Sequence, residues 1–319
     1  MKILKIKFPK VWISDRYSIL QIKENIPREN SVNILTLTYF LNGFLMVAMP
    51  IGLTIYLTRK FKKGWRLFWI GAATFVFSQA LHIPFNALVS PVMNQFGFIA
   101  LPLALQNLIV SVFLGLSAGI FEELSRYIMY RWWVKDARSW GSGLLAGAGH
   151  GGIEAIILGL LTLYGYIQML IARGVDISTL VTPDRVEVAK AQILAYWSAP
   201  WYGTLLGALE RLFAIPIQLT CSILVLQAFT RRRFWWVGLA ILFHALTDGI
   251  AVFASQNGAS VIFIEGIVGI YALVGIIIIF ALRQTELAAG AVSFPNIPAE
   301  FKPKPLNESI ENLDETRYH

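Results

Sequence analysis

Residues 141–172 read GSGLLAGAGHGGIEAIILGLLTLYGYIQMLIA. This run is predominantly apolar and exceeds the about 20 residues that an α-helix needs to cross a bilayer. Two ionisable side chains interrupt it, His150 and Glu154. Because an α-helix returns to the same face after four residues, both side chains lie on one side of the predicted helix. The run therefore predicts a transmembrane helix that carries a polar pair inside the membrane.

The rest of the chain has the same apolar character. Of its 319 residues, 56% are hydrophobic and 14% are charged, whereas soluble domains carry about 25% charged residues. We expect an all-α, polytopic membrane helical bundle with about seven (six to eight) transmembrane helices. The apolar runs lie at 32–58, 67–89, 100–121, 141–172, 203–229, 234–255 and 261–282.

The composition divides the chain into three parts. Residues 1–31 form a polar, basic N-terminal segment. We expect no cleavable signal peptide, because the first apolar run is longer than a signal-peptide core. Residues 32–283 form the multi-pass domain, and residues 284–319 are predicted to be a disordered cytoplasmic tail because they lack an apolar period. Within the domain, residues 182–197 have a proline at the first helical position and apolar residues at helical spacing, which predicts a helix on the outer surface.

Basic residues gather in alternate loops between the runs. The loops near 90–100 and 255–260 carry no charge. Since cytoplasmic loops are enriched in Lys and Arg, we expect a cell-membrane protein with its N-terminus outside and its C-terminus inside, although the basic N-terminal segment opposes this orientation. The net charge of +8 is then explained by membrane orientation and anionic lipid, and no nucleic-acid partner is expected. The basic loop residues are Arg59, Lys60, Lys62, Lys63 and Arg66, then Arg126, Arg131, Lys135 and Arg138, then 231–233.

Two further polar groups interrupt the apolar runs. His244 and Asp248 are again four residues apart, and Glu122, Glu123 and Arg126 follow the third run. An ionisable side chain in a bilayer costs roughly 2.5 to 3.5 kcal/mol, so a cluster of them indicates a functional site. The spacing of Glu122 and Arg126 predicts an ion pair that keeps the carboxylate charged.

Depth counting places these groups at two levels. Counted at about 1.5 Å per residue from the basic ends, Glu122 and His150 lie roughly 13 Å deep and His244 roughly 15 Å deep. The two acids that follow the histidines, Glu154 and Asp248, fall roughly 20 Å from the same side. Glu210, counted from the other end of its run, arrives near the second level in a core about 30 Å thick. The coincidence predicts one polar site built from several helices.

Structural interpretations stand beside the functional one. Glu122, Glu123 and Arg126 could form a salt bridge at a helix end, and Glu210 with Arg211 suits structural ion pairs as well as catalysis. The single cysteine excludes an intrachain disulfide and a Cys-rich metal site, and we interpret it as a packing residue. This cysteine is Cys221. We interpret His82 as structural. The glycines 147, 149, 151 and 152 suit close helix packing and the close approach of a substrate equally well.

The ordered polar motifs resemble a known family. Glu122-Glu123 with Arg126, the His150 turn, Glu210-Arg211 and His244 with Asp248 look like the YhfC-like family of intramembrane proteases, related to the CAAX-processing and bacteriocin-processing (CPBP) membrane proteases. The resemblance covers roughly residues 35 to 283. It implies that Glu122 activates a water molecule together with His150, while His244 stabilises the oxyanion. From their places around these three residues we expect supporting roles for Glu123, Arg126, Glu154, Glu210, Arg211 and Asp248.

Two departures from the CPBP pattern bear on the mechanism. The arginine follows the second glutamate after two residues instead of three, so Glu122 and not Glu123 stands four residues before Arg126. In addition, Asp248 replaces an asparagine, and an ionised aspartate cannot donate a hydrogen bond to an oxyanion. Asp248 therefore raises a metal-dependent alternative in which Glu122 is the general base. Zinc would then be held by His150, His244 and Asp248 or Glu154.

The sequence thus predicts an intramembrane endopeptidase that hydrolyses peptide bonds with a water activated by Glu122 and His150. We favour the glutamic-type mechanism without a cofactor over the zinc-dependent one, and we expect the glycine-rich turn to give the substrate room. The expected partners are the lipid bilayer and a membrane-associated peptide or protein. A proton-coupled carrier also places His and carboxylates at the bilayer midplane and remains an alternative. A non-catalytic scaffold on a protease fold is a third alternative.

Overall fold

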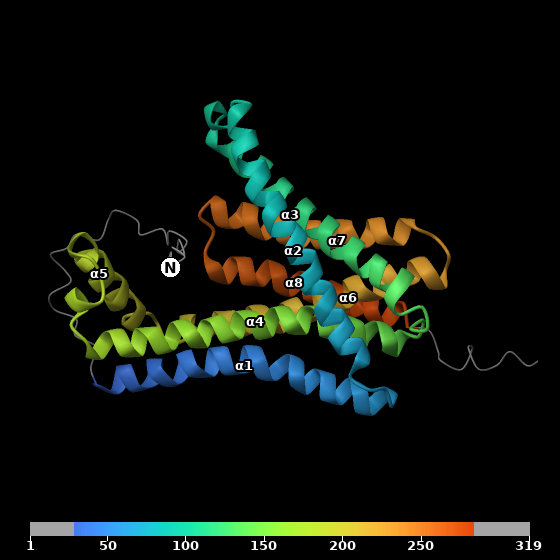
Figure 1. Ribbon diagram of the computed structural model, residues 1–319, viewed down its shortest axis with the longest axis horizontal. Coiled ribbons are helices and arrows are strands. Elements are labelled where there is room, and N and C mark those ends of the chain that lie inside the picture. Colours follow the sequence, from blue (N-terminus) through green and yellow to red (C-terminus); the bar gives the residue numbers. More distant parts are fainter. Residues whose placement is uncertain (1–28, 284–319) are drawn as a thin grey trace, which may run out of the picture. The chain divides into compact units, whose positions relative to one another are not determined.

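The computed structural model describes residues 29–283, and these contain helices and no strand (Figure 1). The all-α prediction is confirmed. The predicted N-terminal segment, 1–31, lies outside the described residues except for 29–31, which begin α1, and the predicted tail, 284–319, lies wholly outside them. The helices are α1 (Glu29–Phe61), α2 (Arg66–Gln95), α3 (Leu103–Ile128), α4 (Trp140–Gly174), α5 (Val186–Trp197), α6 (Leu206–Thr230), α7 (Trp235–Gln256) and α8 (Val261–Ala281).

Within the described residues, 7 helices are long and apolar enough to cross a membrane, which confirms the predicted number. The third differs most from its predicted bounds, because α3 runs on into a π-helical turn, Met129–Trp133. Glu122 and Glu123 therefore lie inside a helix rather than at its end. The assignment of Arg126 to a basic loop is wrong, since its side chain is buried in α3.

Glycines set the distances between the helices that carry the polar residues. A Cβ atom added at Gly71 of α2 would lie 2.1 Å from the carbonyl oxygen of Ala146 in α4, and one at Gly115 of α3 would lie 2.4 Å from the carbonyl oxygen of Ala245 in α7. Both distances are far below any real carbon–oxygen contact. Only glycine therefore allows α2 to meet α4, and α3 to meet α7, at these spacings.

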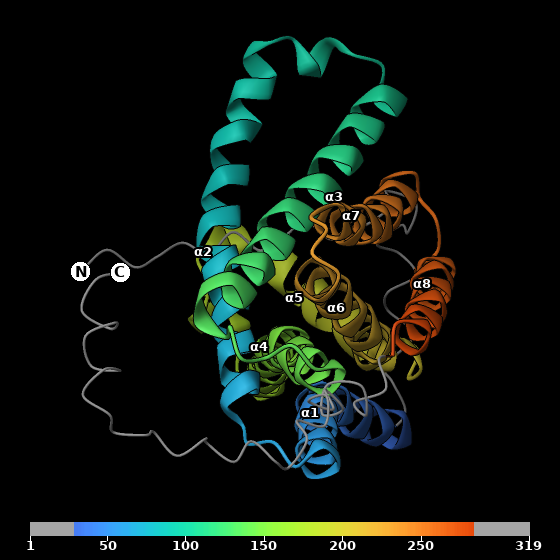
Figure 2. The ribbon, with the colours of Figure 1, turned by 90° about the vertical axis from the view of Figure 1, so that its right-hand side faces the viewer.

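Helix α6 holds the centre of the bundle. It contacts α1, α3, α4, α7 and α8, and Figure 2 shows it end-on between α4, α7 and α8. Asn42 of α1 fixes its start, because its Oδ1 accepts a hydrogen bond of 2.6 Å from the backbone N–H of Ala208. That N–H belongs to the first turn of α6 and has no partner within the helix. The second half of α6 is almost wholly buried, from Ile217 to Gln227.

The segment between α4 and α6 contains the predicted helix. Pro183 begins a short 3₁₀ turn, Pro183–Arg185, which leads into α5. The last residue of α5, Trp197, is buried against Tyr39 of α1, with ring centroids 5.9 Å apart. The helix at 182–197 is confirmed, while its position on the outer surface of the membrane remains a prediction.

Candidate active site

The carboxylate of Glu122 is the hub of the polar site. Its Oε1 accepts a hydrogen bond of 2.9 Å from Gln79 Nε2 of α2, and its Oε2 lies 3.1 Å from His150 Nε2 of α4. Gln218 Nε2 of α6 donates to the same Oε2 at 3.3 Å. Because three helices supply N–H groups to one carboxylate, the charge of Glu122 is stabilised although its side chain is 7% exposed.

Glu123 and Arg126 form a second, deeper layer. Arg126 lies closest to Glu123 and to the side-chain oxygen of Gln218, and its Nη2 is 3.7 Å from Glu122 Oε2. The predicted ion pair between Glu122 and Arg126 is therefore present, and Arg126 forms a second and closer pair with Glu123. His244 of α7 donates from Nδ1 to Glu123 Oε1 at 2.7 Å.

This hydrogen bond orients the imidazole of His244. With Nδ1 facing Glu123, its Nε2 points to the opposite side, where it lies 3.9 Å from Glu122 Oε2 and 3.4 Å from Asp248 Oδ2. A carboxylate on Nδ1 is the usual way in which proteins fix a histidine that uses Nε2 as a ligand or proton carrier. The acids at 122 and 248 thus share one imidazole nitrogen.

A polar cavity of about 130 Å³ lies beside these groups, which is room for several water molecules. Glu122, His244 and Asp248 line it on one side. On the other side Arg211 Nη1 donates to Glu154 Oε1 at 2.6 Å, and Arg211 also pairs with Glu210. The side chains of Asp248 and Glu210 are 43% and 46% exposed, so the cavity opens to the surface of the protein beside these two residues.

Two predicted features lie apart from the cavity. His82 Nε2 lies 3.0 Å from Ser117 Oγ and 2.9 Å from Asn86 Nδ2, in agreement with its structural interpretation. A Cβ atom at Gly149 would lie 2.0 Å from the carbonyl oxygen of Phe68. The glycines around His150 therefore serve helix packing, and the expectation that they leave room for a substrate is wrong. Cβ atoms at Gly147, Gly151 and Gly152 would meet Leu219, Gln218 and Pro50.

Sequence reasoning missed four residues of the site or its surroundings. Gln79 and Gln218 are neutral amides in apolar helices, so only their tertiary contacts identify them. Gln218 bridges the two polar layers, because its Nε2 donates to Glu154 Oε2 at 2.9 Å as well as to Glu122. Glu265 is a lone acid in an apolar run, and its charge was a signal that could have found it. The fourth is Cys221, interpreted as a packing residue.

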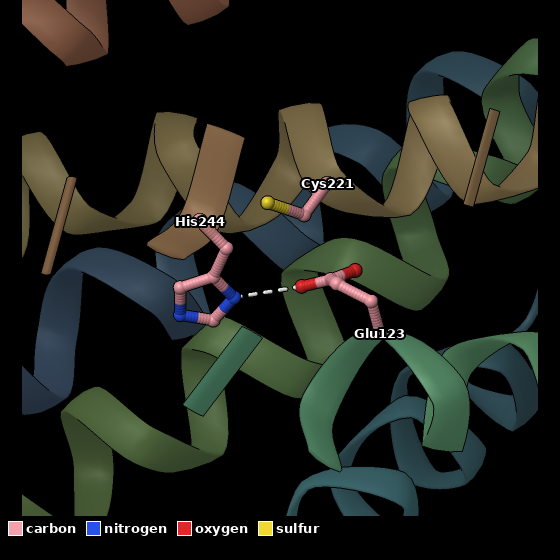
Figure 3. Close-up of side chains that lie close together, drawn as sticks. All are labelled: Glu123, Cys221 and His244. Carbon is pink, nitrogen blue, oxygen red and sulfur yellow. Dashed lines mark hydrogen bonds and ion pairs between the residues drawn. The ribbon is translucent and has the colours of Figure 1, made fainter. Parts of the chain in front are cut away.

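Cys221 belongs to a buried group that could hold a metal ion. One ligand atom each of Glu123, Cys221 and His244 lies within 4.8 Å of the others (Figure 3). In the part of the chain that the structure describes, this is the one such group of three, and it is not the set expected for zinc. All three side chains are buried, as in closed structural sites, and Glu123 is already paired with Arg126.

The cavity side of His244 offers a second donor set. Nitrogen and carboxylate donors of the type that zinc prefers meet there, at His244 Nε2, Asp248 and Glu122, next to room for water. The carboxylate of Glu123 on Nδ1 completes this arrangement. His150 does not line the cavity, and its Nε2 lies 3.1 Å from Glu122 Oε2, while Glu154 is held by Arg211 and Gln218. The cavity side thus offers a metal ion two donors beyond the general base, His244 Nε2 and Asp248, whereas the buried group of Glu123, Cys221 and His244 offers three.

Comparisons with known proteins agree with the arrangement of the motifs. The family model described as YhfC intramembrane metalloprotease matches residues 45–278. The uncharacterized membrane protein YhfC of Bacillus subtilis (strain 168) is 35% identical over 224 residues, which are 66% of this chain and 82% of that protein. No solved structure matches. The resemblance to the YhfC-like family is confirmed, and the relation to the CPBP proteases remains a prediction.

Proposed function

The chain belongs to the YhfC intramembrane metalloprotease family, and we propose that it is a metal-dependent endopeptidase that cleaves membrane-embedded peptides. The supporting observation is the convergence of Glu122, His244 and Asp248 from two helices on one polar cavity among membrane spans. Ionisable groups in a bilayer are retained for function by default. The description of the family favours the metal-dependent alternative over the glutamic-type mechanism that the sequence alone favours.

In this proposal His244 Nε2 and Asp248 would hold the metal ion. A bound zinc ion would polarise the scissile carbonyl and lower the pKa of a water molecule. Glu122 takes the proton of the attacking water. Its hydrogen bonds from Gln79, His150 and Gln218 keep it ionised and aimed at the cavity.

Glu122 then delivers the proton to the amine that leaves when the peptide bond breaks, which is the usual second role of such a base. The guanidinium of Arg211 lines the same cavity. We assign to its positive charge the stabilisation of the carbonyl oxygen of the substrate, where negative charge develops. Glu123 positions His244 and does not contact the substrate.

The test uses the protein purified in detergent and reconstituted into vesicles with total membrane proteins of its host. Elemental analysis should find about one zinc per chain, and mass spectrometry should find new peptide termini. Asp248→Asn should lower metal content and cleavage together by roughly 10- to 100-fold, while Glu122→Gln should abolish cleavage and retain the metal. Glu187→Gln, an exposed change on α5, serves as the control.

Cys221→Ala separates the two donor sets. If the metal ion lies on the cavity side, this variant keeps the metal and the activity. Loss of the metal in Cys221→Ala but not in Asp248→Asn would move the ion to the buried group of Glu123, Cys221 and His244. Full cleavage by metal-free protein, with loss only in Glu122→Gln, would restore the glutamic-type mechanism. Equal cleavage by wild type and Glu122→Gln would end the protease assignment.

A further inference from the structure

A second hollow lies between α6 and α8, apart from the polar cavity. It is an apolar groove of about 730 Å³ that runs from Ile262 to Ile276 of α8, which is about 21 Å along the helix. At the far end the two helices close on each other, because a Cβ atom at Gly275 would lie 2.5 Å from Thr220 Oγ1.

Glu265 lies in this groove as an acid among apolar side chains. The residue is 8% exposed, and within residues 29–283 its Oε2 has no hydrogen-bond partner. Hydrocarbon offers no hydrogen-bond donor, so an unpaired carboxyl oxygen is costly at this place. The groove therefore presents a buried acceptor whose partner is supplied from outside the described chain.

Gly266 leaves part of the floor of the groove open, because a Cβ atom there would meet nothing within 4 Å. A glycine at such a place allows the backbone of another transmembrane helix to approach closely. The rims are apolar and face the lipid, since Ile262 and Leu273 are 65% and 63% exposed.

We propose that this groove docks a transmembrane helix of the substrate that carries a hydrogen-bonding side chain, such as Gln or Ser, at the level of Glu265. An acyl chain would fill the apolar walls but would leave Oε2 without a donor, whereas a polar side chain on a helix satisfies it. Docking of an apolar helix face in a groove is an established mode of recognition. The substrate role rests on the proposed function.

The position of the groove suits this role. The groove and the polar cavity lie on two sides of the contact between α6 and α8, where Ile217 and Val268 line the cavity. The ring of Phe213 covers Gly269 on the groove side, 3.3 Å from where a Cβ atom would be. A helix held in the groove thus lies across the contact between α6 and α8 from the polar cavity. Docking there keeps the neighbouring segment of the same chain close to the cavity.

The test measures binding without cleavage. The full chain with Glu122→Gln is given a photocrosslinking amino acid at Ile270, a 62% exposed residue that lines the groove. It is reconstituted in phosphatidylcholine vesicles with a synthetic leucine-rich transmembrane peptide. One peptide carries a single Gln at the depth of Glu265, and the other carries Leu there. We expect a crosslinking yield about 3- to 15-fold higher for the Gln peptide, the range of one interhelical hydrogen bond in a membrane.

Variants of the groove separate the hydrogen bond from the packing. Glu265→Leu should bring the ratio of the two yields to one, while Glu265→Gln, which keeps an acceptor, should preserve it. Gly266→Leu should lower both yields because it fills the floor. Gly52→Leu should leave them unchanged, since a side chain at this glycine of α1 also meets nothing within 4 Å.

A crosslinker at Ile277, which is 67% exposed and lies outside the groove, supplies the background. Equal yields for the two peptides at Ile270, or adducts with phosphatidylcholine alone, would overturn the proposal. Because binding is read in a Glu122→Gln background, such a result would leave the protease assignment intact. Loss of the protease assignment with retained crosslinking would instead leave a docking groove without its proteolytic role.

Discussion

The buried guanidinium of Arg126 balances two carboxylates, and its removal gives a sharp test of how the site is held together. The side chains of Arg126, Glu123 and Glu122 are 1%, 0% and 7% exposed. Methionine has a similar length and no charge, so Arg126→Met keeps the packing of α3 against α6. It leaves the carboxylate of Glu123 buried without its cation. Breaking a buried ion pair in this way costs about 3–5 kcal/mol of unfolding free energy.

The cost should depend on Glu123, which a second variant tests. In Arg126→Met with Glu123→Gln, no unpaired charge remains at this position, and the amide oxygen still accepts the hydrogen bond from His244. We expect the double variant to recover about 2 kcal/mol of the loss, a coupling energy typical of residues that share one network. The measurement is reversible unfolding in mixed micelles, followed by circular dichroism.

An exposed ion pair supplies the matched control. Arg66 and Asp136 are joined by a hydrogen bond of 2.8 Å, with side chains 57% and 68% exposed. Exposed pairs of this kind contribute little because water screens them, so Arg66→Met should leave the unfolding free energy unchanged. If Arg126→Met were equally silent, or if the double variant lost the sum of the two single losses, the buried charge balance described here would be refuted.

Two further predictions concern the framework. Gly71→Ala should destabilise the protein by about 3 kcal/mol or more, because its Cβ atom would lie 2.1 Å from the carbonyl oxygen of Ala146. Gly52→Ala, where a Cβ atom meets nothing within 4 Å, should be neutral or stabilising by up to about 1 kcal/mol. Unfolding curves measure both variants, and equal stabilities would contradict the prediction. Asn42→Ala should cost about 1–3 kcal/mol by leaving the N–H of Ala208 unpaired, which unfolding curves also measure.

The helices were predictable from the sequence because a membrane span is specified by length and apolarity alone. The common level of Glu122, His150 and His244 was also predictable, since depth follows from helical rise. Glu122 indeed lies 3.1 Å from a nitrogen of His150 and 3.9 Å from one of His244. Depth counting fixes a level but not the rotation of a helix about its axis.

The rotation of each helix about its axis and the identity of its neighbours explain the contacts that the sequence did not predict. Arg126 pairs with Glu123 as well as with the predicted Glu122, and its contact with the side-chain oxygen of Gln218 depends on how α3 packs against α6. Gln79 was not predicted for the same reason, because its contact with Glu122 depends on α2 packing next to α3. The sequence around Cys221 indicates only a packing residue. Its proximity to Glu123 and His244 depends on how α3, α6 and α7 pack together.

The choice between the two mechanisms turns on Asp248. As a metal ligand it explains why a carboxylate faces the Nε2 of His244 at 3.4 Å in a cavity that also contains Glu122. In a metal-free mechanism the same carboxylate would repel the developing oxyanion. The membership of the chain in a metalloprotease family and the chemistry of this donor set therefore favour the same alternative.

Hydrolysis in ¹⁸O-labelled water tests the central claim most directly. The reconstituted protein is incubated in H₂¹⁸O with co-reconstituted membrane proteins, and new C-terminal peptides are identified by mass spectrometry. We predict that wild type produces new carboxyl termini carrying ¹⁸O, that Glu122→Gln produces none, and that a zinc chelator removes them until zinc is restored. Identical sets of labelled termini from wild type and Glu122→Gln would contradict the assignment of this polar cluster as a peptide-hydrolysing site.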